Sequence, residues 1–439
     1  MKTDLPKSAD LVMALPIQGE SFLLRRSGKN VLIDGGYKKD KIADVLNGQF
    51  SDVSYLSVVV CTHGDNDHVG GVADLLEKWG ERVGQLWLPG RWVDVVPDLV
   101  CDPAKFFKQL ISELDAELRQ SSDAILSIIQ NTTVEALRGD VQKDRGNSPY
   151  ADNIQPVDEW VNDPDLPFDT TDVGYEPEWF AEIRRSRVDS VNTEGASSAY
   201  KSARRKVRYR LKKITSEYQA RIACYWLGLI ETAEAIRKVA NAAIEQKIPT
   251  RWFDFEGFQK TRQANGGARG FLVPVNSVEQ ASSPKNIAIY LRLTEINRES
   301  LVFLAPPARE RLGVLFCADS PLGDGSDFGV SFLSSLRMPR TWFPIVATAP
   351  HHGSESNNSA YSHLHDWANI ATLLRAGGSK KQPGATFLSQ HTCLRLCTKC
   401  PKADHPPLLS GVFLSRPYHN RCHPGISSHL IAFGRRCVC

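Results

Sequence analysis

The chain has 439 residues, of which 42% are hydrophobic and 23% charged, and its net charge is +3. This balance is ordinary for a folded protein of two or three domains and excludes polyanion binding by bulk charge, so any nucleic-acid surface must be local. No stretch approaches the roughly 18 apolar residues that span a bilayer, and the first residues lack a signal-peptide core, which predicts a cytoplasmic protein without membrane contact.

The first hundred residues alternate between strand and helix patterns. Strands are expected in the segments LVMALPIQGESFLLRR, NVLIDGG, LSVVV and GQLWLP, and helices near 41–47 and 69–79. This alternation is typical of a layered α/β fold, in which polar functional residues follow the carboxyl ends of strands. Residues 1–100 are therefore predicted to form the first half of such a fold.

From about residue 101 the pattern becomes helical. Apolar residues in FFKQLISELDAELRQ, and again over 207–243, recur at spacings of three and four, which predicts long helices or a helical hairpin. Between them, 152–182 carries ten acidic residues and no Lys or Arg, which is typical of a loop or linker. We interpret 101–280 as a helical insertion that offers a surface for a partner protein or for homodimerisation.

The β pattern resumes over 281–390, and a Cys/His-rich tail over 391–439 then holds six of the ten cysteines. In a cytoplasmic protein, closely spaced thiolates and imidazoles favour a structural zinc site over a disulfide framework. The alternative is a set of free or redox-active cysteines. The candidate zinc ligands are His391, Cys393, Cys397, Cys400, Cys422, His423, Cys437 and Cys439.

The segment THGDNDHVGG concentrates side chains that bind metals, and it follows the apolar run LSVVV. Its metal-capable residues are His63, Asp65, Asp67 and His68. A turn after a strand lets alternate side chains converge on one point, while the adjacent Asp-His pair reaches a second point a few ångströms away. A lone Asp-His pair would be typical of a helix cap, whereas four such residues favour a site for two divalent cations.

This loop resembles the signature of the metallo-β-lactamase superfamily, whose usual form is His-x-His-x-Asp-His. The segments VLIDGG, VLFCADS and APHHGS are similar to further motifs of that family and follow in the same order. The resemblance implies an αββα sandwich with a metal-dependent hydrolase site. It also implies that Asp34 supports the metal loop from behind, that Asp319 bridges the metals, and that APHHGS carries the last metal-binding histidine.

Asp65 in the second motif position, together with the Pro-His-His-Gly-Ser loop, resembles the ComEC-type branch of the superfamily. That branch is named for the hydrolase domain of DNA-uptake channel proteins, and the resemblance implies nuclease activity. No histidine lies between His68 and His351, so a first site of the common three-histidine type cannot be completed from that span. A carboxylate-rich site suits Mn²⁺ or Mg²⁺ as well as Zn²⁺.

Two ligand sets follow from the resemblance. The first metal is assigned to His63, Asp65 and Asp319. The second is assigned to Asp67, His68, Asp319 and His351. His351 is preferred over His352 because it directly follows Pro350, and Asp67 is also expected to orient the attacking hydroxide. His352 and Ser354 are expected to contact substrate oxygen.

The segment KSARRKVRYRLKK is strongly basic. Its candidate nucleic-acid contacts are Arg204, Arg205, Arg208 and Lys212. Such a helix can bind phosphates with release of counterions, and the alternative is the solvated face of a packed helix.

The leading functional prediction is a metal-dependent hydrolase, a phosphodiesterase or nuclease that uses a metal-activated hydroxide. A hydrolase of a small phosphodiester, lactone or thioester is the first alternative, because fold alone does not separate these substrates. A non-catalytic regulatory or partner-binding module is the second alternative.

Overall fold

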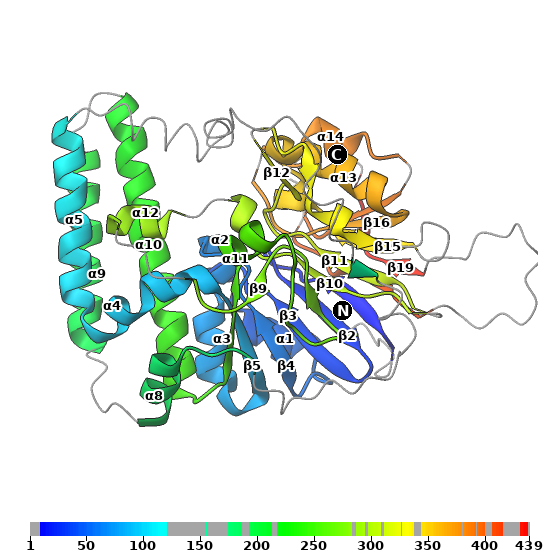
Figure 1. Ribbon diagram of the computed structural model, residues 1–439, viewed down its shortest axis with the longest axis horizontal. Coiled ribbons are helices and arrows are strands. Elements are labelled where there is room, and N and C mark those ends of the chain that lie inside the picture. Colours follow the sequence, from blue (N-terminus) through cyan, green and yellow to red (C-terminus); the bar gives the residue numbers. More distant parts are fainter. Residues whose placement is uncertain are drawn as a thin grey trace, which may run out of the picture.

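Figure 1 presents the computed structural model of the chain. It describes residues 9–120, 155–156, 174–186, 193–212, 217–282, 287–294, 297–308, 311–325, 327–337, 344–379, 381–391, 393–399, 406–415 and 431–437. Two large β-sheets occupy the centre of the protein, and a layer of long helices stands on one side of them (Figure 1).

In the described part of the chain, the first sheet has nine strands in the order β19-β18-β1-β2-β3-β4-β5-β7-β9. The strands are β1 (Leu11–Ala14), β2 (Phe22–Arg26), β3 (Lys29–Ile33), β4 (Leu56–Val60), β5 (Val83–Pro89), β7 (Thr250–Asp254), β9 (Val278–Glu279), β18 (Ser410–Phe413) and β19 (Ala432–Phe433). The neighbours β3, β4, β5 and β7 are parallel, so their carboxyl ends meet at one edge of the sheet.

The second sheet has seven described strands in the order β20-β17-β16-β15-β11-β10-β8. They are β8 (Val273–Pro274), β10 (Phe303–Ala305), β11 (Gly313–Phe316), β15 (Ile345–Thr348), β16 (Ile370–Arg375), β17 (Leu394–Cys397) and β20 (Arg435–Arg436). Here β11, β15, β16 and β17 are parallel neighbours. Two short ladders join β12 (Gly323–Asp324) to β13 (Val330–Ser331) and β6 (Gln155–Pro156) to β14 (Leu336–Arg337).

Alternating apolar side chains bury both faces of each sheet. In β4, Val58 and Val60 enter the core between the sheets, while Val59 packs toward the helices on the outer face. In β11, Val314 enters the same inter-sheet core and Leu315 packs on the opposite side.

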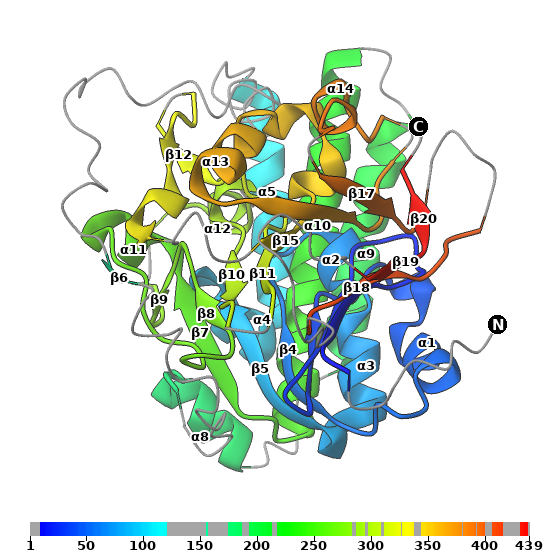
Figure 2. The ribbon, with the colours of Figure 1, turned by 90° about the vertical axis from the view of Figure 1, so that its right-hand side faces the viewer.

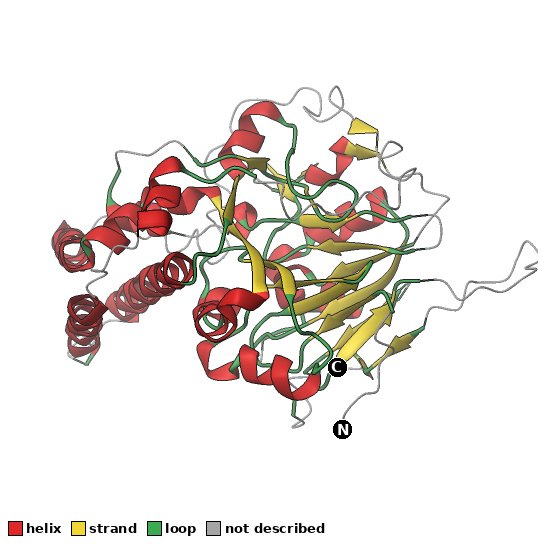
Figure 3. Ribbon diagram, turned by 90° about the horizontal axis from the view of Figure 1, so that it is seen from below, coloured by secondary structure: helices red, strands yellow, loops and turns green. Residues whose placement is uncertain are grey.

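Helices cover the two outer faces, and Figure 3 shows the strands lying between them. The helices are α1 (Ile42–Gln49) and α3 (Val72–Trp79) on the first sheet, and α11 (Phe255–Thr261), α13 (Ser359–Trp367) and α14 (Ala385–Leu388) on the second. This order of layers confirms the predicted αββα sandwich.

A further group of helices packs outside the first sheet. It comprises α4 (Val96–Cys101), α5 (Pro103–Gln120), α8 (Glu178–Ser186), α9 (Thr193–Leu211), α10 (Glu217–Glu245) and α12 (Ile289–Leu293). Helices α5, α9 and α10 lie side by side, and α10 also contacts α3 and the short helix α2 (Asn66–Val69) (Figure 1). The periodic segment 207–243 is divided between α9, which ends at Leu211, and α10, which begins at Glu217, so the apolar spacing predicted helix but not this boundary.

Two expected boundaries differ from the structure. The helical segment ends at Glu245, because residues 250–254 form β7 beside β5 and 278–279 form β9 in the first sheet. The segment 391–439 is not a separate tail in its described part: β17 and β20 extend the second sheet, and β18 and β19 extend the first (Figure 2). Short strands near a sheet edge have no local sequence pattern that distinguishes them from a loop-rich tail.

Within the described residues, no helix has both the length and the apolar character needed to cross a bilayer.

Candidate metal centre

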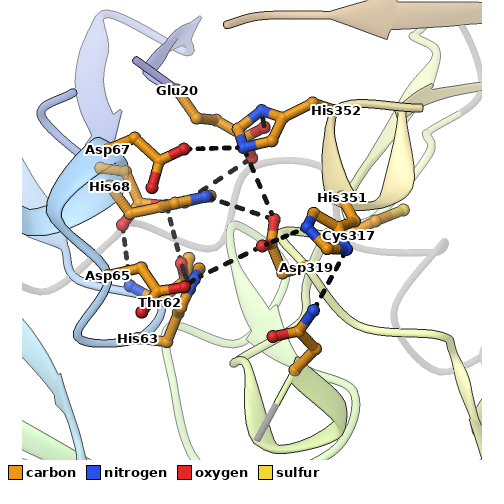
Figure 4. A network of polar contacts seen from close by, with 12 residues as sticks. Glu20, Thr62, His63, Asp65, Asp67, His68, Cys317, Asp319, His351 and His352 are labelled. Atoms are coloured by element: carbon orange, nitrogen blue, oxygen red, sulfur yellow. Dashed lines mark hydrogen bonds and ion pairs between the residues drawn. The ribbon is translucent and has the colours of Figure 1, made fainter. Parts of the chain in front are cut away.

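The metal-capable side chains meet where strands of both sheets end. His63 follows β4 of the first sheet, Asp319 follows β11 of the second, and His351 and His352 follow β15 of the second. The neighbours β11 and β15 are parallel, so the two loops that follow them lie next to each other. Figure 4 shows these side chains pointing toward one another, together with Glu20 from the turn between β1 and β2.

The loop after β4 is held in place by Asp34, which follows β3. Its buried carboxylate accepts hydrogen bonds from the backbone N of Thr62 at 2.9 Å and from Thr62 Oγ1 at 2.7 Å. The same carboxylate lies 2.9 Å from His68 Nδ1. This contact favours a proton on Nδ1 and leaves Nε2 of His68 facing the site. The structure thus places Asp34 behind the metal loop, where the sequence predicted it.

A tight backbone crossing positions the helix that carries Asp67 and His68. Helix α2 begins after Asp65, and Gly71 then passes against the loop that follows β3. A Cβ atom at Gly71 would lie 2.3 Å from the carbonyl oxygen of Gly35, so a larger residue would force the two loops apart.

Two groups of donors converge on Asp319. One group consists of Glu20, His68, Asp319 and His352, all buried, and the other of His63, Asp65 and Asp319; within each group, donor atoms lie within 4.8 Å of one another. Asp319 Oδ1 is 3.2 Å from His68 Nε2, and Oδ2 is 3.7 Å from His63 Nε2. The sequence predicted that His63, Asp65 and Asp319 would share one site and that Asp319 would also serve the other, and the structure brings these residues together.

The positions of the two adjacent histidines correct the sequence assignment. His352 Nε2 lies 3.2 Å from Asp67 Oδ2, so His352 joins the group of His68, where His351 was expected. His351 Nε2 lies 3.4 Å from Asp319 Oδ2, the oxygen that also faces His63. Both histidines have left-handed backbone angles, with φ of 47° and 53°. This turn directs neighbouring side chains to different sides of Asp319, which their order after a strand does not predict.

The polar atoms of this cluster fit a cation. Three atoms, His63 Nε2, His68 Nε2 and Asp319 Oδ1, are buried and make no hydrogen bond with any residue that the structure describes. Both histidine nitrogens nevertheless lie within ion-pair distance of the Asp319 carboxylate. Buried polar atoms without hydrogen bonds are costly unless a ligand satisfies them. Imidazole nitrogens and carboxylate oxygens that face a shared point are suitable ligands for Zn²⁺ or Mn²⁺.

Charge within the cluster favours a cation too. Burial lowers the pKa of His68, but Asp319 and Asp34 outweigh this effect and raise it well above its usual range. Burial raises the pKa of Asp319, but His351 and His68 hold it well below its usual range. The carboxylate therefore stays ionised, and its negative charge is available to a metal that displaces the histidine protons.

Three residues of the site were missed by the sequence analysis. Glu20 contributes a buried carboxylate, Asn297 Nδ2 lies 3.1 Å from His351 Nδ1, and the buried Arg375 donates from Nε to the carbonyl oxygen of His352 at 2.7 Å. Of the three, only Glu20 could have been found from the sequence, because it is an acid beside a glycine in the short turn between two apolar strands. Asn297 and Arg375 have no such local pattern.

Other predicted residues lie elsewhere. Ser354 Oγ accepts from the backbone N of Ser356 and contacts the Ser356 hydroxyl, so it caps a turn, and it reaches His351 Nδ1 only through that hydroxyl. In the tail, His391 is exposed and Cys393 is half-buried, while Cys397 and Cys437 are buried and interact, which together with burial raises the pKa of the Cys397 thiol. The remaining predicted ligands Cys400, Cys422, His423 and Cys439 lie outside the described residues.

The family comparison agrees with this geometry. Residues 14–86 match the family model described as the metallo-beta-lactamase superfamily, a span that runs from the last residue of β1 into β5 and includes the whole metal loop. Comparison with curated proteins gives no match. The αββα layers are consistent with the metallo-β-lactamase fold. The match and the donor cluster together indicate a metal-dependent hydrolase that uses divalent metal.

Proposed function

We propose that the protein is a phosphodiesterase that cleaves nucleic acid with the help of two divalent cations. The first would be held by His63, Asp65, Asp319 and His351. The second would be held by Asp67, His68, Asp319 and His352. When bound, such a pair activates water and neutralises charge on phosphoryl oxygens. Carboxylates from three aspartates favour Mn²⁺ or Mg²⁺ alongside Zn²⁺.

The protein's own side chains have separate tasks in this proposal. Asp319 directs one carboxylate oxygen toward each histidine group, so it would set the separation of the two cations. Asp67 is partly exposed, and its Oδ2 lies 3.2 Å from His352 Nε2, so its carboxylate can orient the attacking water and accept a proton from it.

Nucleic acid is proposed as the substrate because two hydrogen bonds to Glu231 connect the metal loop to the basic helix α9. Asn66 Nδ2 donates to Glu231 Oε2 at 3.4 Å, and Arg204 Nε donates to Glu231 Oε1 at 2.9 Å. Beyond Arg204, α9 exposes the side chains of Arg205 and Arg208. A cationic helix next to the metal loop would hold a polyanion across the reacting centre. The resemblance to the ComEC-type branch supports the same substrate class.

Cleavage assays test this proposal. Protein loaded with Mn²⁺ or Zn²⁺ would be incubated with plasmid, single-stranded DNA and RNA, beside a variant that carries Asp67→Ala and His68→Ala. We expect the native protein alone to cleave a nucleic acid. Hydrolysis of only bis-p-nitrophenyl phosphate, a lactone or a thioester would contradict the substrate class. Tight metal binding without any turnover would favour a regulatory module instead.

Neutralising two exposed arginines of α9 is expected to weaken nucleic-acid binding. In a variant with Arg205→Gln and Arg208→Gln, two phosphate contacts disappear, so the magnitude of the slope of log affinity against log salt should fall by about 1.4 on single-stranded DNA. Fluorescence anisotropy with a labelled single-stranded oligonucleotide over a range of salt concentrations measures the slope. A variant with Lys247→Gln and Lys260→Gln, two exposed residues outside α9, is the control. An unchanged slope in the α9 variant would remove this helix from the binding surface.

The structural zinc site of the tail also remains a proposal, with Cys397 and Cys437 as its described ligands. A variant with Cys397→Ser and Cys437→Ser is expected to lose one zinc per chain, because thiolates are the strongest zinc ligands there. Elemental analysis measures the loss, with Cys101→Ser and Cys224→Ser, two exposed cysteines, as the control. Equal zinc in both variants would rule the site out. Truncation is unsuitable, since it would remove strands from both sheets.

A further inference from the structure

The turn between β1 and β2 is locked against the metal loop by its backbone. The backbone N of Glu20 donates to the carbonyl oxygen of Asp67 at 2.7 Å, and the N of Gly36 donates to the carbonyl oxygen of Glu20 at 2.9 Å. A Cβ atom at Gly19 would lie 2.5 Å from the same Asp67 oxygen, so this close approach requires glycine. The position of Glu20 is therefore tied to the position of Asp67.

The side chain of Glu20 reaches the other ligand loop. It is 1% exposed, and Oε2 lies 3.0 Å from His352 Nδ1. The carbonyl oxygen of Ala376 lies at the same distance from this nitrogen. The Ala376 carbonyl accepts a hydrogen bond from Nδ1, and the Glu20 carboxylate places a negative charge beside the same atom, so a proton on Nδ1 is favoured and Nε2 of His352 is left to face Asp67 and the metal cluster.

The direction of its contacts distinguishes Glu20 from the residues that would bind metal. Its carboxylate is close enough to the cluster to be a ligand by proximity alone. However, its contacts are to Nδ1 of His352 at 3.0 Å and to Nδ1 of His68 at 4.0 Å, while the Nε2 atoms of both rings face Asp319. The Glu20 carboxylate thus faces Nδ1 of His352 as the Asp34 carboxylate faces Nδ1 of His68, where the 2.9 Å contact is a hydrogen bond.

We propose that Glu20 is a positioning residue that sets the tautomer of His352 and joins the loop of Asp67 to the loop of His352. The inference rests on the proposed metal site. A carboxylate on the far nitrogen of a metal-binding histidine raises the basicity of the ligand and fixes its ring orientation. Glu20 also connects Asp67, which follows β4 of the first sheet, to His352, which follows β15 of the second. Among the described residues, no other backbone hydrogen bond of Asp67 makes such a connection.

Metal binding by Glu20 variants tests the inference. Glu20→Gln retains an oxygen that can accept from Nδ1 but removes the charge, so we expect metal affinity to fall about tenfold; Glu20→Ala removes both, and about a hundredfold loss is expected. Chelator competition gives the affinities for Zn²⁺ and Mn²⁺, and elemental analysis the stoichiometry. Glu279→Gln is the matched control, because it alters a carboxylate of the edge strand β9 that pairs with Arg251 of β7.

A second readout does not depend on metal or turnover. Long-range ¹H–¹⁵N NMR of the metal-free protein, recorded above the raised pKa of His352, is expected to show the neutral ring protonated at Nδ1 in the native chain and in Glu20→Gln. In Glu20→Ala the share of this tautomer is expected to fall, with the Ala376 carbonyl as the remaining acceptor. Unchanged tautomer and affinity in Glu20→Ala would overturn the inference, as would losses equal to those of Glu279→Gln. A native protein that binds no metal would instead contradict the proposed function, while the NMR result would still decide the role of Glu20.

Discussion

Asp319→Asn is expected to lower hydrolytic turnover by about a thousandfold, because losing about 4 kcal/mol of charge stabilisation corresponds to that factor. The carboxylate of Asp319 directs Oδ1 toward His68 and Oδ2 toward His63 and His351 (Figure 4). Asparagine has nearly the same shape but only one oxygen and no charge. It therefore cannot serve both groups of ligands, and the protein should also bind fewer metal ions.

Initial rates at saturating metal, together with elemental analysis, measure both effects of this substitution. Asp324→Asn is a suitable control, because Asp324 is another buried acid in the same segment and pairs with Arg262 outside the cluster. A turnover within tenfold of the native value, with full metal content, would show that Asp319 does not bridge the two groups.

His352→Asn is expected to remove one of two bound metal ions and to impair turnover more than His351→Asn does. His352 is 2% exposed and contacts Asp67, Asp319 and Glu20, whereas His351 is partly exposed and contacts the cluster at Asp319. The loss for His352→Asn should be larger by about tenfold or more, which is about 1.4 kcal/mol.

Rates and metal content of the two variants, measured side by side, decide this ranking. The two residues are adjacent and chemically identical, so each variant is the matched control for the other. A larger loss in His351→Asn would restore the assignment made from the sequence and would place the imidazole of His352 outside the cation site.

Several features of the protein were predictable because the residues responsible are close in the chain. The loop from His63 to His68 spans one turn and one short helix, so its spacing already specifies which side chains converge. The strand patterns of β4 and β11 predicted buried strands, because the period of two along a strand acts locally. The roles of Asp34 and Asp319 were implied by the resemblance of VLIDGG and VLFCADS to motifs of the metallo-β-lactamase superfamily.

Other features depended on contacts between distant segments, for which no local pattern exists. The assignment of His352 to the group of His68 depends on left-handed backbone angles at two adjacent residues. Arg375 reaches His352 across parallel neighbours of the second sheet, and the late strands β18 and β20 pair with β1 and β17. Such pairing is stabilised only in the assembled core.

By itself, the amino-acid sequence determined the layered α/β pattern and the cluster of metal-capable residues after β4, because both depend on side-chain spacing within a few residues. The αββα class and the supporting role of Asp34 were implied by the resemblance of its motifs to those of the metallo-β-lactamase superfamily. Only the tertiary structure decided that Glu20 contacts His352, that Asn66 and Glu231 connect the metal loop to Arg204 of α9, and that the last described segment completes both sheets. The physical reason is that these contacts arise when the two sheets and the helical layer pack together, and packing between distant segments leaves no period in the sequence.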